Sequence, residues 1–283
     1  MNRADLTANQ QTAMLADRYT QRADAYEALW SPIIRPVGER LISDLSLGGA
    51  KSIIDVGTGA GALLPAIRRA APDATILGVD RSDGMLRLAR QKHSGSLALM
   101  DVQNLALAAN RFDAAVVAFV LFHVPSPERC LSEVNRVLQP AGTVGTVTWG
   151  AERVPMANAV WDEELGAAGA YVLELPATDN RECCDNAHKV TSLLEQAGFD
   201  VARVWSESIE HRWRREDYFE YQMRSTSRLR LLSLDEGDRV ACLRRIRERL
   251  AGLGDEQYLY SGEVVMAIAQ KSGGAHKLGG DDG

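Results

Sequence analysis

The sequence has few cysteines, no large excess of either charge and no long hydrophobic run. Four unevenly spaced cysteines in 283 residues cannot supply a disulfide framework, so free thiols are expected. With 32 basic against 38 acidic residues, the chain has a net charge of −6 and lacks the positive field that nonspecific nucleic-acid binding requires. The longest apolar run, residues 114–122, has nine residues, whereas a membrane-spanning helix needs about 20. These absences argue against a disulfide-rich scaffold, a nucleic-acid-binding protein and a membrane protein.

Apolar residues are plentiful, at 46% of the chain, which is enough for one large core or two modest ones. The first ten residues contain no apolar stretch after Arg3 and do not read as a secretory signal, so a cytoplasmic protein is expected. No metal site is expected, and a monomer and a homodimer are both left open.

Short apolar runs alternate with amphipathic segments through the first half of the chain. Strands are predicted at residues 52–56, 75–79, 97–100, 114–121 and 143–148. Helices are predicted at 62–70, 85–92 and 127–138, with Ser82 and Ser126 as caps of the last two. Strands that alternate with helices of about ten residues form βαβ units, so the pattern predicts an α/β fold with a mostly parallel sheet.

Helical segments flank this region and interrupt the second half of the chain. Residues 1–47 are predicted to form two helices separated by a break at Pro32 and Pro36. Further helices are predicted at 186–197, 216–231 and 235–250, strands at 201–209 and 258–269, and a disordered tail at 272–283. We therefore expect a helical lid at 1–47 and a cofactor domain at 48–271, with helical insertions at about 151–185 and 212–256.

A glycine-rich loop joins the first predicted strand to the following helix, with Gly57, Gly59 and Gly61 at alternate positions. Glycine permits positive φ and close approach of a ligand to the backbone, and a helix start offers unpaired N–H groups. The loop therefore predicts a ligand site. It also fits the dinucleotide-binding pattern, so the glycines alone do not separate a nicotinamide cofactor from another adenosine-containing one.

The acidic residues near this loop distinguish a nicotinamide dinucleotide from other adenosine-containing cofactors better than the glycines do. A dinucleotide brings a pyrophosphate with two negative charges, which Asp55 would repel, whereas S-adenosyl-L-methionine carries a net positive charge. Asp80 ends the second predicted strand, where a carboxylate can accept hydrogen bonds from both ribose hydroxyls. Asp101 follows the third strand, where it can accept from the adenine amino group while the Val102 N–H serves a ring nitrogen. Carboxylates at the ends of successive strands favour S-adenosyl-L-methionine.

Several motifs, taken in order, resemble the class I S-adenosylmethionine-dependent methyltransferases, especially the small-molecule group that includes the ubiquinone and menaquinone biosynthesis enzymes. These motifs are residues 54–61, 78–80, 85–86, 100–102, 112–113, 120–124 and 133–142. The resemblance implies a Rossmann-like seven-stranded sheet, mostly parallel with an antiparallel last strand, plus helical lid elements. The cofactor-binding residues expected from the motifs and from the resemblance are Tyr19, Tyr26, Asp55, Gly57, Thr58, Gly59, Asp80, Arg81, Met85, Asp101, Val102 and Phe119.

The reaction this resemblance implies is methyl transfer to a small acceptor, with secondary metabolism as one setting. The methylated atom, O, N or C, is left open. Candidates for a general base are His123, His211 and Glu207, and the alternative for His123 is simple packing after a buried strand. An aromatic lining that suits a flat or hydrophobic acceptor is expected from Trp30, Trp149, Trp161, Tyr171, Trp213, Tyr218, Phe219 and Tyr221.

Three other functions stay open at this stage. An RNA methyltransferase is one, because residues 203–249 hold 12 arginines against nine acidic residues; paired charges on solvated helix faces are the alternative interpretation. A nicotinamide oxidoreductase is the second, because the glycine loop fits it. A noncatalytic S-adenosylmethionine-binding protein on the same fold is the third.

Overall fold

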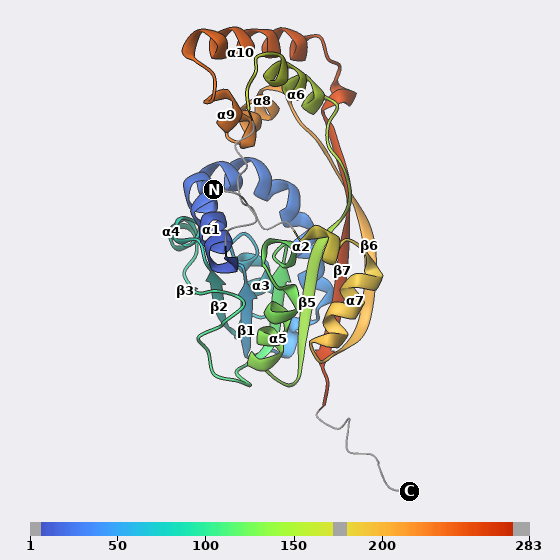
Figure 1. Cartoon of the computed structure of the whole chain (residues 1–283). Coiled ribbons are helices and arrows are strands. Elements are labelled where there is room, and N and C mark those ends of the chain that lie inside the picture. The colour runs from blue at the N-terminus through green and yellow to red at the C-terminus, as the bar shows by residue number, and fades with distance from the viewer. Residues whose placement is uncertain (1–6, 172–179, 274–283) are drawn as a thin grey trace, which may run out of the picture.

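Among the described residues, seven strands pair into one sheet in the order β3-β2-β1-β4-β5-β7-β6 (Figure 1). The computed structural model describes residues 7–171 and 180–273. The strands are β1 (Ser52–Val56), β2 (Thr75–Asp80), β3 (Ser96–Leu99), β4 (Phe112–Ala118), β5 (Leu138–Arg153), β6 (Phe199–Arg212) and β7 (Leu259–Lys271). Neighbours among β1 to β5 are parallel, whereas β7 runs antiparallel to both β5 and β6. The predicted sheet, mostly parallel with an antiparallel last strand, is confirmed.

Helices cover both faces of this sheet. The α-helices are α1 (Ala8–Ala25), α2 (Ser31–Asp44), α3 (Leu64–Ala70), α4 (Asp83–Lys92), α5 (Pro127–Val137), α6 (Ala157–Ala167), α7 (Ala187–Gln196), α8 (Arg215–Met223), α9 (Thr226–Leu231) and α10 (Glu236–Ala251). The connections β1 to β2 and β4 to β5 run in opposite directions across the sheet, so right-handed crossovers place α3 and α4 on one face and α5 on the other. α2 packs beside α3, and α7 packs beside α5.

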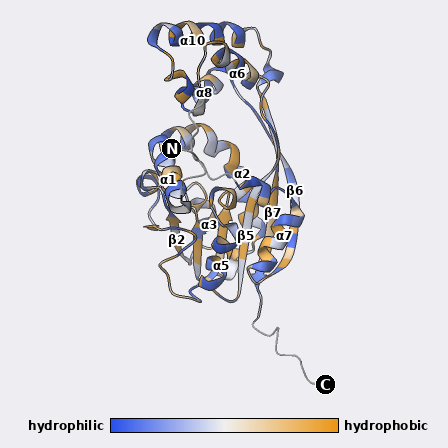
Figure 2. Ribbon diagram, viewed as in Figure 1, coloured by the Kyte–Doolittle hydropathy of each residue, from blue (hydrophilic) through white to orange (hydrophobic). Residues whose placement is uncertain are grey.

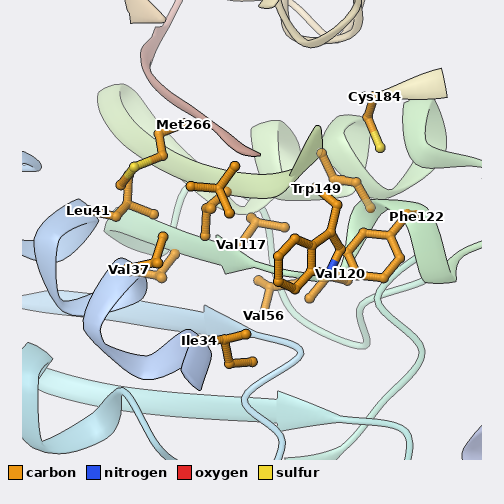
Figure 3. Close-up of a cluster of buried hydrophobic side chains, with 14 of the residues drawn as sticks. Ile34, Val37, Leu41, Val56, Val117, Val120, Phe122, Trp149, Cys184 and Met266 are labelled. Carbon is orange, nitrogen blue, oxygen red and sulfur yellow. The ribbon is translucent and has the colours of Figure 1, made fainter. Parts of the chain in front are cut away.

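α2 closes one face of the sheet with an apolar stripe. Its residues Ile34, Val37 and Leu41 recur at three- and four-residue steps and point toward the strands (Figure 3). Apolar residues gather where the strands meet these helices, whereas α10, at the far end of the molecule, is mostly hydrophilic (Figure 2). The main core therefore lies between the sheet and its covering helices.

The predicted break at Pro32 and Pro36 is wrong. α1 continues through a π-helical turn, η2 (Tyr26–Trp30), into α2, and the Ser31 N–H donates to the Tyr26 carbonyl. Pro32 is the second residue of α2 and follows the π-helical turn directly. Pro36 lies inside α2, where a proline lowers the stability of the helix by about 3 kcal/mol. Burial of one large apolar side chain stabilises the fold by about 1.5–3 kcal/mol, and α2 buries five such side chains, which outweighs this cost.

β4 is shorter than the strand predicted at 114–121, because it ends at Ala118. Phe119 has a φ of +57°, and a 3₁₀ turn, η4 (Leu121–His123), follows. The last residue pair that β1 and β4 share is Asp55 with Val116, so beyond that point β4 has only β5 as a neighbour. The chain is therefore free to leave the sheet and to turn η4 toward the ends of the parallel strands.

Three long strands carry a helical layer beyond the rest of the sheet. β5, β6 and β7 have 16, 14 and 13 residues and extend toward α6, α8, α9 and α10, while α1 lies between this layer and the sheet (Figure 1). The single helix predicted at 216–231 is two helices, because the Ser225 side chain caps α9 and separates it from α8.

Parts of three predictions lie outside the described residues. These are positions 1–6 of the helical lid, 172–179 of the first helical insertion and 274–283 of the tail. Within the described ranges, no helix has both the length and the apolar character that crossing a membrane requires.

Candidate active site

The glycine loop turns sharply between β1 and α3. Gly57, Gly59 and Gly61 have φ values of +73°, +55° and +79°, which residues with a side chain adopt rarely. The Gly57 N–H donates to the Val79 carbonyl of β2 at 2.8 Å. A Cβ on Gly57 would lie 2.3 Å from Val120 Cγ2, whereas nothing lies within 4 Å of a Cβ built on Gly59. The loop is therefore closely packed at Gly57 and open at Gly59.

Asp80 ends β2 with its carboxylate held by two backbone N–H groups. Gly59 N donates to Oδ2 at 2.9 Å, and Ser82 N donates to Oδ1 at 2.8 Å. Burial raises the pKa of Asp80, and these two hydrogen bonds oppose that rise. A carboxylate oxygen can accept more than one hydrogen bond. The group is therefore oriented by the protein and can still accept hydrogen bonds from a ligand.

Asp55 lies in β1 and is only 2% exposed. Thr58 Oγ1 donates to its Oδ2 at 2.6 Å. Burial raises the pKa of Asp55 to about 6, while the hydrogen bond from Thr58 lowers it in part. Neither Asp55 nor Thr58 lines the cavities described below. Asp55 therefore lies behind the loop, where it orients Thr58, and does not form part of a cavity wall.

We expect Asp55→Asn to stabilise the fold in a pH-dependent way. The folded-state pKa of about 6 lies above the ordinary value of 3.8, so the ionised carboxylate destabilises the folded state as pH rises through 6. Asparagine keeps an acceptor for Thr58 without the charge. Urea unfolding should show a gain of up to about 3 kcal/mol at pH 8, since each pKa unit corresponds to about 1.4 kcal/mol, and almost none at pH 4. The control is Asp73→Asn in an exposed turn, whose stability should change equally at pH 8 and pH 4. An equal gain of Asp55→Asn at both pH values would contradict a raised pKa of Asp55 in the folded state.

A first cavity, the loop cavity, has a volume of about 130 Å³ and lies at the carboxyl ends of the parallel strands. Its lining comes from α1, η2, the glycine loop, the ends of β2 and β4, and the segment after β3: Thr12, Leu15, Ala16, Tyr19, Tyr26, Gly57, Gly59, Asp80, Arg81, Ser82, Met85, Asp101, Val102, Ala118, Phe119, Val120, His123 and Val124. Arg81 Nη1 lies 2.8 Å from Asp101 Oδ2, so these two residues form an ion pair at its wall. The cavity thus combines one oriented carboxylate with apolar surface.

A second cavity, the aromatic cavity, has a volume of about 360 Å³ and lies between α1, β5 and the start of α9. Its lining is Leu15, Arg18, Tyr19, Arg22, Ala25, Tyr26, Trp30, Phe122, His123, Trp149, Glu152, Arg181, Tyr221, Arg224 and Ser225. Trp30 and Tyr221 stack at 5.8 Å with 19° between their planes, and Trp149 lies 6.0 Å from Trp30. Such flat walls suit a flat, apolar ligand.

The two cavities share a wall that consists of Leu15, Tyr19, Tyr26 and His123. The Tyr19 hydroxyl and His123 Nε2 are 2.7 Å apart, and the Tyr26 ring meets the Tyr19 ring edge-on at 5.5 Å. Burial raises the pKa of Tyr19, so this phenol remains protonated at neutral pH. A tyrosine–histidine pair that can move a proton therefore stands between the two cavities.

The structure brings most of the predicted site residues together and leaves a few apart. Those that line the loop cavity are Tyr19, Tyr26, Gly57, Gly59, Asp80, Arg81, Met85, Asp101, Val102 and Phe119. His211 lines neither cavity; it lies on β6 with its ring edge-on to Trp213 at 4.6 Å. Glu207 forms an ion pair with Arg40 at 2.6 Å. Neither residue is positioned to act as a base on a ligand in these cavities.

The aromatic prediction holds for three of its eight residues, Trp30, Trp149 and Tyr221. Trp161 is buried against Phe219 at 5.4 Å in the helical layer. The others are Tyr171, which is exposed, Trp213, which stacks behind Tyr221, and Tyr218, which is buried. These side chains of α6 and α8 therefore belong to the continuous hydrophobic core and not to the cavity wall.

The sequence analysis missed the charged groups that face the aromatic cavity, which are Arg18, Arg22, Glu152, Arg181 and Arg224. For Arg22 a signal existed, because Leu15, Tyr19, Arg22 and Tyr26 follow helical spacing and share a face.

Known proteins resemble this chain in sequence and in fold. The methyltransferase domain family matches residues 54–145. The ubiquinone/menaquinone biosynthesis C-methyltransferase of Syntrophotalea carbinolica is 37% identical over 215 residues, which cover 70% of this chain and 90% of that protein. A Bacillus halodurans structure assigned as a methyltransferase matches with a TM-score of 0.55 at 18% identity, over 83% of this chain and 98% of its own. The cyclase SpnF matches with a TM-score of 0.53 at 18% identity, over 85% and 81% of the two chains.

The fold and the loop cavity define a Rossmann-like α/β protein whose ligand site lies at the carboxyl ends of the strands, where the strand order reverses. The fold alone does not decide the reaction, since a cyclase has it too. Sequence similarity decides: the chain belongs to the family of S-adenosylmethionine-dependent methyltransferases and is a methyltransferase. Membership implies S-adenosyl-L-methionine as the methyl donor.

Proposed function

We propose that this methyltransferase acts on a small aromatic acceptor that carries a hydroxyl group. The observation that carries the proposal is the hydrogen-bonded pair of Tyr19 and His123 on the wall between the two cavities. A donor held in the loop cavity and an acceptor held in the aromatic cavity would meet at this wall. The pair is then within reach of the acceptor hydroxyl, where general acid–base catalysis requires a proton acceptor.

The residues of the loop cavity fit S-adenosyl-L-methionine. Gly59 leaves its outer side open for the methionine part, and Asp80 has acceptor capacity for both ribose hydroxyls. Met85 lies where it would cover one adenine face, with Asp101 and Val102 at the adenine edge. Bound there, the donor supplies a methyl group that its sulfonium already activates. The buried negative charge of Asp55 behind the loop favours a ligand of net positive charge.

The chain itself would orient the acceptor, exclude water and move one proton. The Tyr19 hydroxyl lies 2.7 Å from His123 Nε2 and is protonated at neutral pH. In the His123 tautomer whose Nε2 carries no hydrogen, Tyr19 would donate its hydroxyl hydrogen to Nε2 and present an oxygen that can accept the acceptor proton. The proton passes from the acceptor to Tyr19 oxygen as the Tyr19 proton passes to His123. A donor bound in the loop cavity would supply the methyl group to the deprotonated acceptor, with S-adenosylhomocysteine as the leaving group.

The helices around the aromatic cavity would act as a lid. α1 and the start of α9 contribute opposite walls, and Trp30, Trp149 and Tyr221 supply apolar surface that excludes water. This proposal keeps the predicted lid function of residues 1–47 and of the second insertion.

An aromatic hydroxyl can be methylated on oxygen or on a neighbouring ring carbon, because loss of its proton spreads negative charge over both atoms. The relative from Syntrophotalea carbinolica is named a C-methyltransferase of quinone biosynthesis. For this chain we therefore favour the ring carbon, which afterwards loses its hydrogen as a proton. A role in secondary metabolism stays a prediction.

Ion pairing of the Arg-rich segment favours a small acceptor over RNA. Seven of its twelve arginines form ion pairs among the described residues: Arg203–Asp44, Arg212–Glu256, Arg214–Asp217, Arg224–Glu220, Arg230–Asp162, Arg245–Glu164 and Arg249–Glu163. Paired guanidinium groups contribute less to binding of a phosphate backbone.

The proposal is tested by methyl transfer from isotopically labelled S-adenosyl-L-methionine to 1,4-naphthohydroquinone, 1-naphthol and, as a non-hydroxyl control, 1-naphthylamine. We expect S-adenosylhomocysteine and a methylated product in equal amounts with the hydroxyl-bearing compounds. Bulk transfer RNA in a parallel reaction should take up no label. Label in the amine or in RNA alone, or cofactor binding without transfer to any hydroxyaromatic compound, would refute the proposal.

A further inference from the structure

The aromatic cavity has a positive lining that methyl transfer does not explain. Among the described residues of its lining there are four arginines, Arg18, Arg22, Arg181 and Arg224, and one carboxylate, Glu152. Arg181 forms an ion pair with Glu152 at 2.6 Å, and Arg224 forms one with Glu220. Arg18 and Arg22 both come from α1, so basic side chains outnumber acidic ones on the α1 side of the described lining.

Arg22 is the centre of this excess. Its side chain is half-buried, and among the described residues its guanidinium makes no hydrogen bond or ion pair. Burial lowers the pKa of Arg22, and Arg18, one helical turn away, lowers it further. An arginine fork without an acceptor loses strong hydrogen bonds. An anion in the cavity would supply this acceptor.

We propose that the acceptor carries a carboxylate group and that Arg22 binds this group. The inference deepens the proposed function and rests on it. Arg22 and Tyr19 are three residues apart on the same face of α1, so an anion on Arg22 and a hydroxyl at Tyr19 would be about one helical turn, roughly 5 Å, apart. Between them the ring of the acceptor would lie against Trp30 and Tyr221. The substrate class is thus a hydroxyaromatic acid.

Calorimetric titration with 2-naphthoate and with 2-naphthamide tests this inference, because the two compounds have the same shape and differ in charge. The native chain should bind naphthoate at least about tenfold more tightly, as expected for a charge-assisted pair. Arg22→Gln should weaken naphthoate binding about tenfold and leave naphthamide unchanged. Arg22→Lys should keep most of the preference. The matched control is Arg35→Gln, an exposed arginine of α2, and it should change neither affinity.

Three results would overturn the inference: equal affinity of the native chain for the two compounds, no binding of either, or equal loss of both in Arg22→Gln. The first two need no variant, so misfolding of a variant does not protect the inference. Tighter binding of 2-naphthyl phosphate than of naphthoate would refute the carboxylate and indicate a phosphate instead. Titration with S-adenosylhomocysteine is separate, so its failure would refute the proposed function without affecting the naphthoate result.

Discussion

Replacement of Asp80 by alanine is expected to weaken binding of S-adenosyl-L-methionine by at least about 100-fold, since two hydrogen bonds to a charged acceptor contribute roughly 1.5–3 kcal/mol each. The protein already orients both carboxylate oxygens through the N–H groups of Gly59 and Ser82. A ribose would therefore meet an acceptor that needs no reorganisation. The loss of these contacts also frees the Gly59 amide and loosens the loop, so the two effects act in the same direction.

Calorimetric titration of Asp80→Ala with S-adenosyl-L-methionine and with S-adenosylhomocysteine measures this loss. The control is Asp83→Ala, three residues further along, where the carboxylate is exposed and pairs with Arg87 on α4. It should bind both compounds as the native chain does. Thermal melting separates lost affinity from lost folding. Native affinity in a folded Asp80→Ala variant would show that the ribose is bound elsewhere.

Replacement of His123 by glutamine should lower kcat by about 100-fold or more, because a positioned general base contributes 10²–10⁴-fold. Glutamine keeps a hydrogen-bonding group near Tyr19 but cannot take up a proton. Tyr19→Phe interrupts the same relay at its first step and should lower kcat by a similar factor. The affinity for S-adenosylhomocysteine should change little in either variant, since no charge is removed from the loop cavity.

The pH dependence of the rate separates proton transfer from simple packing by His123. In the native enzyme the rate should fall at acid pH as the base becomes protonated, and in His123→Gln this fall should disappear. His188→Gln, an exposed histidine of α7, is the control and should keep the native profile. An unchanged kcat in His123→Gln would assign this residue to packing and leave the acceptor to lose its proton to water.

Local patterns predicted the elements on which the donor site depends. β1 has the bounds predicted for it, and Ser82 and Ser126 cap α4 and α5 as expected, because strand alternation and capping are properties of short segments. Proline signals were a poor guide at α2, where burial of an apolar face outweighed a local penalty. The end of β4 could not be predicted from local patterns either, because the length of β4 depends on where the neighbouring strand β1 stops.

Residue type and position in the sequence were not enough to predict which side chains line the cavities. His123 and His211 were both candidate bases in the sequence, but η4 brings the first to the wall of both cavities, whereas the second, on β6, lines neither. Trp161 and Phe219 were expected in the acceptor site and instead pack against each other in the hydrophobic core. Each outcome depends on the length and direction of strands that pair only after the chain has folded.

The sequence by itself determined the α/β fold, the glycine loop and the position of Asp55, Asp80 and Asp101 toward the carboxyl ends of their strands, because parallel strands bring these ends to one edge of the sheet. The tertiary structure alone decided which of these groups line a cavity. It placed Asp55 behind the loop, joined Tyr19 to His123 across 104 residues, and left Arg22 facing an aromatic cavity. Such contacts join distant segments, and they follow from the order in which strands pair and from how α1 packs on the finished sheet.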